Sequence, residues 1–133
     1  MIVHEHPSGL KVSTPEGAAV AERTAAGFLI KAVGATRMRF PTEVQLELRP
    51  GAAPAGEWPQ TRTVGAHRVH HELEIVDGGS GGQEQILNTW VPAGEGHLWT
   101  EQVAQTEPPA KPDFSLTWTM LEGLQLPTNW GER

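Results

Sequence analysis

The sequence predicts an α+β domain in which a twisted antiparallel sheet of about six to seven strands is covered by one C-terminal amphipathic helix. Two observations carry this prediction. Apolar and polar residues alternate along several segments of the chain, and apolar residues recur at helical spacing near the C-terminus. At 133 residues the chain is long enough to bury one core, so we expect residues 1–133 to form a single binding domain.

The composition indicates a compact, turn-rich protein with an acidic surface. Hydrophobic residues make up 38% of the chain, and its 15 glycines and 11 prolines favour turns. The net charge of −6 disfavours nucleic acid and anionic membranes as partners and favours a cationic protein. The absence of cysteine excludes disulfides and thiol chemistry. No apolar run approaches the roughly 18 residues that a membrane-spanning helix needs.

The first half of the chain predicts three strands and a short helix. Residues 10–13 alternate between apolar and polar types after a turn signal, which predicts a strand. Residues 16–26 are rich in alanine and follow Pro15, so we expect a short helix there. The apolar segment 27–33 predicts a second strand. Residues 42–49 predict a third, with the following side chains on its apolar face: Val44, Leu46 and Leu48.

The second half of the chain predicts further strands and then one helix. Residues 50–59 hold three prolines and are typical of an exposed loop. Strands are expected over residues 62–66, 69–76, 84–91 and 97–104, and residues 67–104 are expected to form an antiparallel meander.

A helix follows this meander. Asp113 can cap it, because an aspartate carboxylate accepts hydrogen bonds from the first-turn amides. Pro127 lies beyond its end. The side chains expected on its buried face are Phe114, Thr117, Trp118, Leu121 and Leu124.

A glycine-rich run joins two of the predicted strands. Four of the chain's 15 glycines lie between Asp77 and Gln83, so we expect a loop that the flanking strands display. The pattern G-x-S-x-G around Ser80 also occurs in hydrolases, but a helix should then follow the serine, and here a strand follows. The run also lacks the closing lysine of a phosphate-binding loop and the alternating oxygen ligands of a calcium-binding loop.

Histidines and carboxylates lie close to this loop. On a strand, His67 and His71 share one face and His70 takes the other, so a metal site is disfavoured and non-ligand roles are expected. The strand then carries Glu72, Glu74 and Asp77. These carboxylates fit a glycosidase-like pair, a solvated face or a binding surface that meets a basic cleft. Trp90, Trp99 and Trp118 are expected in the core.

Short motifs between residues 6 and 125 resemble, in their order and spacing, a family of bacterial immunity proteins. Members of that family protect against a muramidase effector of type VI secretion. The most distinctive match is the glycine-rich loop. The matching motifs are His6-Pro7-Ser8-Gly9-Leu10, Gly27-Phe28, Arg39-x-Pro41, Asp77-Gly78-Gly79-Ser80-x-Gly82 with Glu84, Pro92-Ala93-Gly94, Glu101-Gln102 and Phe114-x-Leu116-x-Trp118-x-x-Leu121-Glu122.

This resemblance implies a non-enzymatic protein that inserts loops into the glycan cleft of a goose-lysozyme-like muramidase, with a fold similar to PsbP-like proteins. It implies calcium on the effector side and neither metal nor cofactor on this chain. The family acts in the periplasm, often from lipid-anchored precursors, so we expect that an export segment was removed. The alternative is a cytoplasmic adaptor chaperone of the same secretion system, which would account for the missing export segment.

One hairpin cannot bury the area of about 1,600 Å² that a standard interface requires. A second loop must therefore contribute, and residues 102–111 and the turn 92–96 are the candidates. The residues expected to contact the effector are Glu72, Glu74, Asp77, Gly78, Gly79, Ser80, Gly81, Gln83, Gln102, Gln105 and Glu107.

Overall fold

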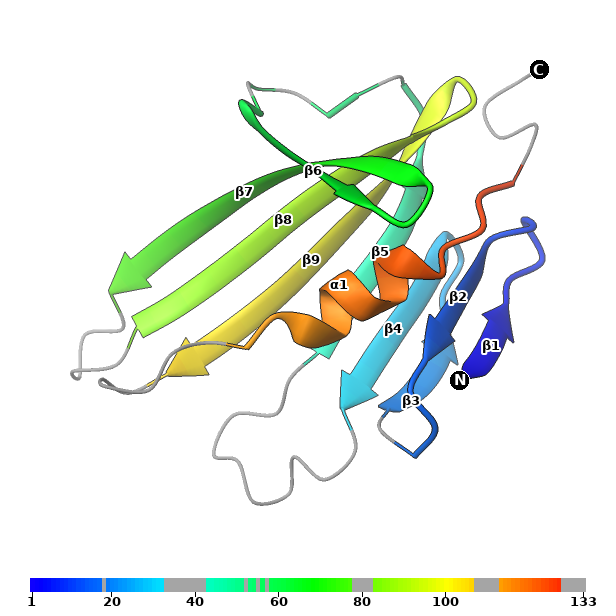
Figure 1. Ribbon diagram of the computed structural model, residues 1–133, viewed down its shortest axis with the longest axis horizontal. Helices are drawn as coiled ribbons and strands as arrows, with labels where there is room; N and C mark the ends of the chain where they lie inside the picture. Colours follow the sequence, from blue (N-terminus) through cyan, green and yellow to red (C-terminus); the bar gives the residue numbers. More distant parts are fainter. Residues whose placement is uncertain are drawn as a thin grey trace.

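The computed structural model describes residues 1–17, 19–32, 43–51, 53–54, 56, 58–77, 83–106 and 113–127. Within these residues it confirms the α+β prediction: one helix packs on one face of a seven-stranded antiparallel sheet, beside a two-stranded sheet (Figure 1). The seven strands follow the order β3-β4-β5-β9-β8-β7-β6. The elements are β1 (Ile2–Glu5), β2 (Lys11–Thr14), β3 (Ala19–Arg23), β4 (Gly27–Ala32), β5 (Glu43–Arg49), β6 (Gln60–Val64), β7 (His67–Asp77), β8 (Gln83–Ala93), β9 (Gly96–Thr106) and α1 (Ser115–Glu122).

The helix expected over residues 16–26 is wrong, because this segment contains strand β3, paired antiparallel with β4. Ala19 and Ala21 pack against the core, and Val20 between them is exposed, so burial alternates with the period of a strand. A tight connection closes the hairpin: Thr24 accepts a hydrogen bond from the Gly27 amide at 3.0 Å through its side chain. The alanine content misled the prediction because the pairing with β4 overrides a weak helical propensity.

The core lies between the sheet and α1. The predicted apolar face of β5 is confirmed, since Val44, Leu46 and Leu48 are all buried. Opposite residues of an antiparallel pair share a face of the sheet, so the register places Leu98 of β9 on the same side. Figure 1 shows α1 crossing this side of the sheet. The helix contributes the buried residues Thr117, Met120 and Leu121.

The start of α1 is fixed by two hydrogen-bonded side chains. Asp113 accepts a hydrogen bond from the Ser115 amide at 2.9 Å, although the residue in the N-cap position is Phe114. This bond lowers the pKa of Asp113. Gln102 of β9 is fully buried, donates to the Asp113 carbonyl at 3.0 Å and accepts a hydrogen bond from the Thr117 hydroxyl. Gln102 therefore ties the central sheet to the first turn of the helix.

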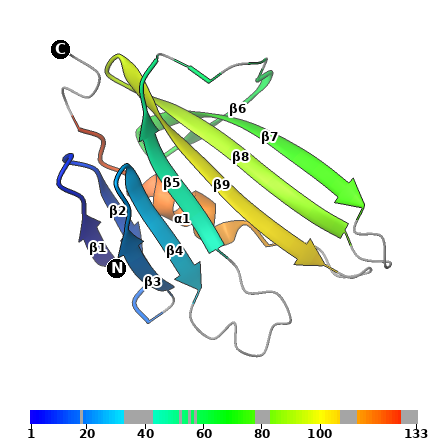
Figure 2. The ribbon, with the colours of Figure 1, turned by 180° about the vertical axis from the view of Figure 1, so that it is seen from behind.

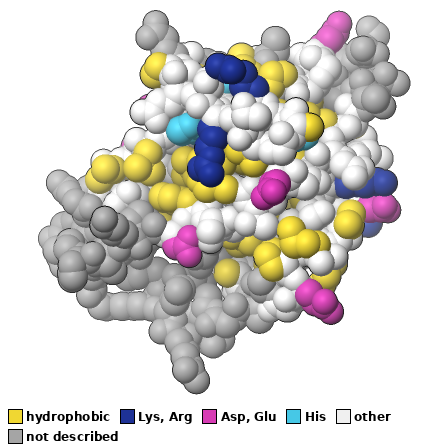
Figure 3. Space-filling model, in the orientation of Figure 1, with side chains coloured by type: hydrophobic (Ala, Val, Ile, Leu, Met, Phe, Trp, Pro, Cys, Tyr) yellow, Lys and Arg dark blue, Asp and Glu magenta, His cyan; other side chains and the backbone are white. Residues whose placement is uncertain are grey.

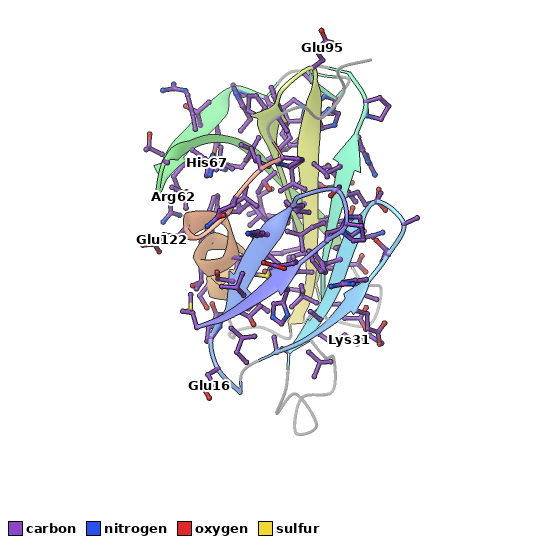
Figure 4. The ribbon with its side chains drawn as sticks, turned by 90° about the vertical axis from the view of Figure 1, so that its right-hand side faces the viewer. Glu16, Lys31, Arg62, His67, Glu95 and Glu122 are labelled. Atoms are coloured by element: carbon purple, nitrogen blue, oxygen red, sulfur yellow. The ribbon has the colours of Figure 1, made fainter. Side chains whose placement is uncertain are left out.

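The end of α1 is held by β6 and β7. His67 donates from Nε2 to the Leu124 carbonyl at 2.8 Å. The Arg62 guanidinium lies 4.3 Å from the ring centroid of Trp118, and His71 meets the same ring edge-on at 5.4 Å. Burial and the nearby Arg62 lower the pKa of His71. Figure 4 shows Arg62 and His67 on the helix side of the sheet, close to Glu122 at the helix end.

Within the described residues, no helix has the length and apolar character needed to cross a membrane.

The turn between β6 and β7 requires glycine at Gly65. Its φ is +58°, and a Cβ there would lie 2.5 Å from the backbone oxygen of Glu122. Gly17 has a similar φ of +71° but has open space around the corresponding position.

We expect Gly17→Ala to lower the free energy of unfolding only by the backbone strain of about 1 kcal/mol. Gly65→Ala should lower it by about 2–4 kcal/mol, because the helix end must also move. Urea unfolding of the two variants measures the difference, and equal losses would contradict it.

Candidate functional site

Three strand ends meet at one end of the sheet, where the sequence predicts the effector contact. Asp77 pairs with Gln83, and Gln83 pairs with Thr106 on its other side. Glu84 pairs with Gln105 one step further in. Residues far apart in the sequence are therefore brought together beside the glycine-rich loop. In Figures 1 and 2 the ends of β7, β8 and β9 form a projecting corner of the sheet.

Part of the predicted site lies outside the described residues. This applies to Gly78, Gly79, Ser80, Gly81 and Glu107. Asp77, Gln83 and Gln105 are described as strand residues without their side chains. What the structure describes is therefore the base on which this loop is mounted.

The carboxylates Glu72 and Glu74 lie on the face of the sheet opposite α1. Both are exposed, and their cross-strand partners on β8 are Asn88 and Ile86. In Figure 2 this face is turned towards the viewer, and α1, the helix of the described residues, lies behind the sheet. We call it the open face. Glu101 of β9 also lies on it, opposite Asn88.

The open face concentrates negative charge around Glu101. Burial raises the pKa of Glu101; Arg49 opposes this shift, whereas the carboxylates of Glu74, Glu47 and Glu84 add to it. Arg49 bonds Glu47 through Nε and Nη2 at 3.2 and 3.0 Å. A raised carboxyl pKa beside a cation shows that burial and the carboxylates outweigh Arg49. The exposed carboxylates of Glu72 and Glu74 suit this face to a cationic partner.

Aromatic side chains lie on the open face near the β8–β9 turn. His70 stacks on Trp90 with ring centroids 4.1 Å apart and planes 7° from parallel. His97 meets Trp90 edge-on and donates from Nδ1 to the Gly51 carbonyl at 2.8 Å. Trp90 is buried as predicted, whereas Trp99 is only partly buried and carries the Arg49 guanidinium 3.9 Å above its ring.

The histidines of this region have contacts within the fold. His67 bonds the Leu124 carbonyl, His70 stacks on Trp90, and His71 contacts Trp118. Among the described residues, no group of three or more His, Cys, Asp or Glu side chains is arranged to hold a metal ion.

Two expectations about the contact surface need correction. Gln102 is fully buried and hydrogen-bonded to the start of α1, so it supports the fold and does not face a partner. The turn between β8 and β9 lies at the opposite end of the hairpin from Gln83, which Figure 4 shows through the position of Glu95. β8 has 11 residues. At about 3.3 Å per residue its ends lie roughly 35 Å apart, too far to enter one cleft together.

Sequence reasoning did not place Glu84, Glu101 and Arg49 together on the open face. Glu84 and Glu101 lie in strands that the alternation predicts, on the polar positions. Their proximity to Glu74 depends on the register between β7, β8 and β9, which hydrophobic alternation alone does not fix.

The raised pKa of Glu101 predicts a pH-dependent gain from removing its charge. A carboxyl with a raised pKa stabilises the fold below its unfolded value of 4.5 and loses that contribution as the pH rises through the folded value. We expect Glu101→Gln to raise the Tm at pH 7 by about 2 °C, a small effect because the group is only partly buried, and to leave it unchanged below pH 4.

Thermal unfolding at both pH values measures this difference. Glu95→Gln, in the exposed β8–β9 turn, is the control and should show no change at either pH. A destabilising effect of Glu101→Gln at pH 7 would contradict the reasoning.

Comparison with solved structures shows the same fold in a protein from Bacteroides thetaiotaomicron VPI-5482, with a TM-score of 0.68 at 9% sequence identity. The match covers 93% of this chain and 47% of the other, so this chain spans about half the length of that protein. LpqN of Mycobacterium tuberculosis, involved in cell envelope biogenesis, matches with a TM-score of 0.47 at 12% identity, over 92% of this chain and 83% of LpqN. Among curated proteins, none matches by sequence.

A protein-family comparison identifies the chain itself. The type six secretion immunity 3 domain, Tsi3, matches residues 11–125. This match begins at Lys11 in β2 and ends at Gln125, which follows α1 and forms an isolated bridge with Lys11. It therefore includes the whole seven-stranded sheet and the helix. The chain therefore belongs to the Tsi3 family of type VI secretion immunity proteins.

Proposed function

We propose that this immunity protein neutralises a secreted peptidoglycan muramidase related to goose lysozyme by plugging its glycan cleft. The observation that carries the proposal is the meeting of three strand ends beneath the glycine-rich loop. A cleft that accepts a glycan chain admits a narrow element with small side chains and polar acceptors. Gly78, Gly79, Ser80 and Gly81 have that character.

The end of β9 provides the second contact that one hairpin lacks. Gln105 pairs with Glu84, and the chain continues from Thr106 into Glu107. The loop and this connection therefore begin from adjacent positions, and together they can approach the area of about 1,600 Å² of a standard interface. Gln102 and the β8–β9 turn are not part of this proposed contact.

Charge supports the same partner. The chain carries a net charge of −6, and Glu72 and Glu74 are exposed on the strand that leads to the loop. An acidic surface accelerates association with a cationic enzyme and fixes its orientation. In this proposal the chain acts in the periplasm without catalysis, and any calcium belongs to the effector.

Inhibition of lysis tests the proposed function directly. The purified protein, added in stoichiometric excess to the muramidase effector encoded beside it, should abolish hydrolysis of purified peptidoglycan, because an occupied cleft excludes the glycan. Turbidity of a cell-wall suspension measures the rate. An unchanged rate would refute the proposal.

The loop itself is tested by Asp77→Lys combined with Ser80→Trp. We expect the pair to weaken effector binding by roughly 100-fold, because it reverses one charge and adds bulk at the centre of the interface. The Tm should stay nearly unchanged. Isothermal titration calorimetry gives the affinity, and Glu95→Lys at the opposite end of the hairpin is the charge-matched control. Retained affinity in the double variant would remove the loop from the interface.

A further inference from the structure

Among the described residues, strand β7 has an open edge along its second half. β6 pairs with β7 only from His67 to His71. Beyond His71, no described strand lies on the outer side of residues 72–77, although β8 pairs with their inner side. Every second residue of such an edge strand directs its N–H and C=O outwards, so about three residues offer unpaired backbone groups.

The side chains along this edge are apolar on one face. Leu73 and Ile75 project to the helix side, opposite Leu87 and Gln85 of β8, and their exposed fractions are 47% and 57%. Figure 3 shows apolar side chains gathered on this face where β7 runs in Figure 1. Large apolar side chains this exposed on an open edge favour contact with another strand.

The other face of the same edge is acidic. Glu72 and Glu74 project to the open face together with Val76, which is 43% exposed. Neither glutamate forms an ion pair within the described residues. A strand added to this edge would therefore meet apolar side chains on one face and mainly carboxylates on the other, at cross-strand distances of about 5 Å.

A second copy of the chain is a poor occupant for this edge. In a symmetric antiparallel pairing, residues on the open face of one copy oppose residues on the open face of the other. The one symmetric register that aligns both apolar residues pairs Leu73 with Ile75, and it sets Glu74 against Glu74. A register that pairs Leu73 with Leu73 sets Glu72 against Glu74, and one that pairs Ile75 with Ile75 leaves Leu73 opposite Asp77. Like charges directly opposite each other are destabilising.

We propose that the β7 edge at residues 72–77 accepts an extended segment of the effector, in which basic residues alternate with apolar ones, as an added strand. Backbone hydrogen bonds supply affinity, and the alternation selects the segment. The edge leads directly into Asp77, so the added strand would lie beside the loop contact. The inference rests on the proposed function, because it assigns the strand to the effector.

A defined peptide tests the edge without the effector. The probe is a capped peptide of alternating Lys and Val, and hydrogen exchange of the full chain is followed by NMR at low salt. We expect the amides of residues 72–77 that face outwards to exchange roughly fivefold more slowly with saturating peptide. A peptide of alternating Glu and Val should give no protection.

Charge reversal tests the selection. The double variant Glu72→Lys with Glu74→Lys should bind the Lys-Val peptide with roughly tenfold lower affinity, because two cross-strand attractions become repulsions. Glu43→Lys with Glu95→Lys makes the same change in net charge at exposed positions away from this edge and should bind like the unmodified chain. Circular dichroism checks the fold of both. Equal affinities for the two double variants, or protection by the Glu-Val peptide, would overturn the inference.

Measuring both inhibition of the effector and amide protection in its complex with this chain distinguishes this inference from the proposed function. Protection of residues 72–77 in the complex supports both. If the effector is inhibited but these amides stay unprotected, the edge inference falls and the proposed function stands. If the effector is not inhibited, the proposed function falls and the assignment of the strand to it falls too, while the peptide still decides what the edge binds. A dimer that buries residues 72–77 in sedimentation and exchange measurements would also overturn the inference.

Discussion

The pairing of β8 with β9 over 11 residues is the constraint on which the rest of the molecule depends. β9 carries β5 on its other edge, and β8 carries β7, so the two strands fix the register of most of the sheet. Gln102 then anchors the start of α1 to β9 through two hydrogen bonds inside the core. A buried amide with both ends bonded sets the position of the helix along the strand, because any shift would leave polar groups unpaired.

The helix covers only part of the sheet that these strands build. Beneath it, Val69 of β7 is fully buried, whereas Ile75 on the same face of the strand is more than half exposed. The three strand ends beyond the helix therefore owe their order to backbone pairing more than to a core. Among the described residues, that arrangement leaves the outer edge of residues 72–77 without a paired strand and the side chains of Leu73 and Ile75 exposed.

Alternation in the sequence predicted the elements that have one buried face, as Val44, Leu46 and Leu48 of β5 illustrate. It failed at Ala19 and Ala21, where small residues fit a helix and a strand equally well until β4 pairs with them. It also failed at Gln102, because a polar residue in a strand is expected to face water unless a distant helix supplies its partners. The meeting of the ends of β7, β8 and β9 was predictable, because an antiparallel meander pairs successive strands. The acidic cluster around Glu101 was not, because it depends on the register across three strands.

The acidic residues of β7 have opposite consequences for self-association and for binding. An open edge with exposed apolar side chains invites pairing with any extended chain, including another copy of the same protein. Glu72 and Glu74 make that self-pairing unfavourable, since the two-fold register that aligns both Leu73 and Ile75 sets Glu74 against Glu74. The same carboxylates attract a basic strand. The side chains that keep two copies of this domain apart therefore also select the charge of the segment that the edge accepts.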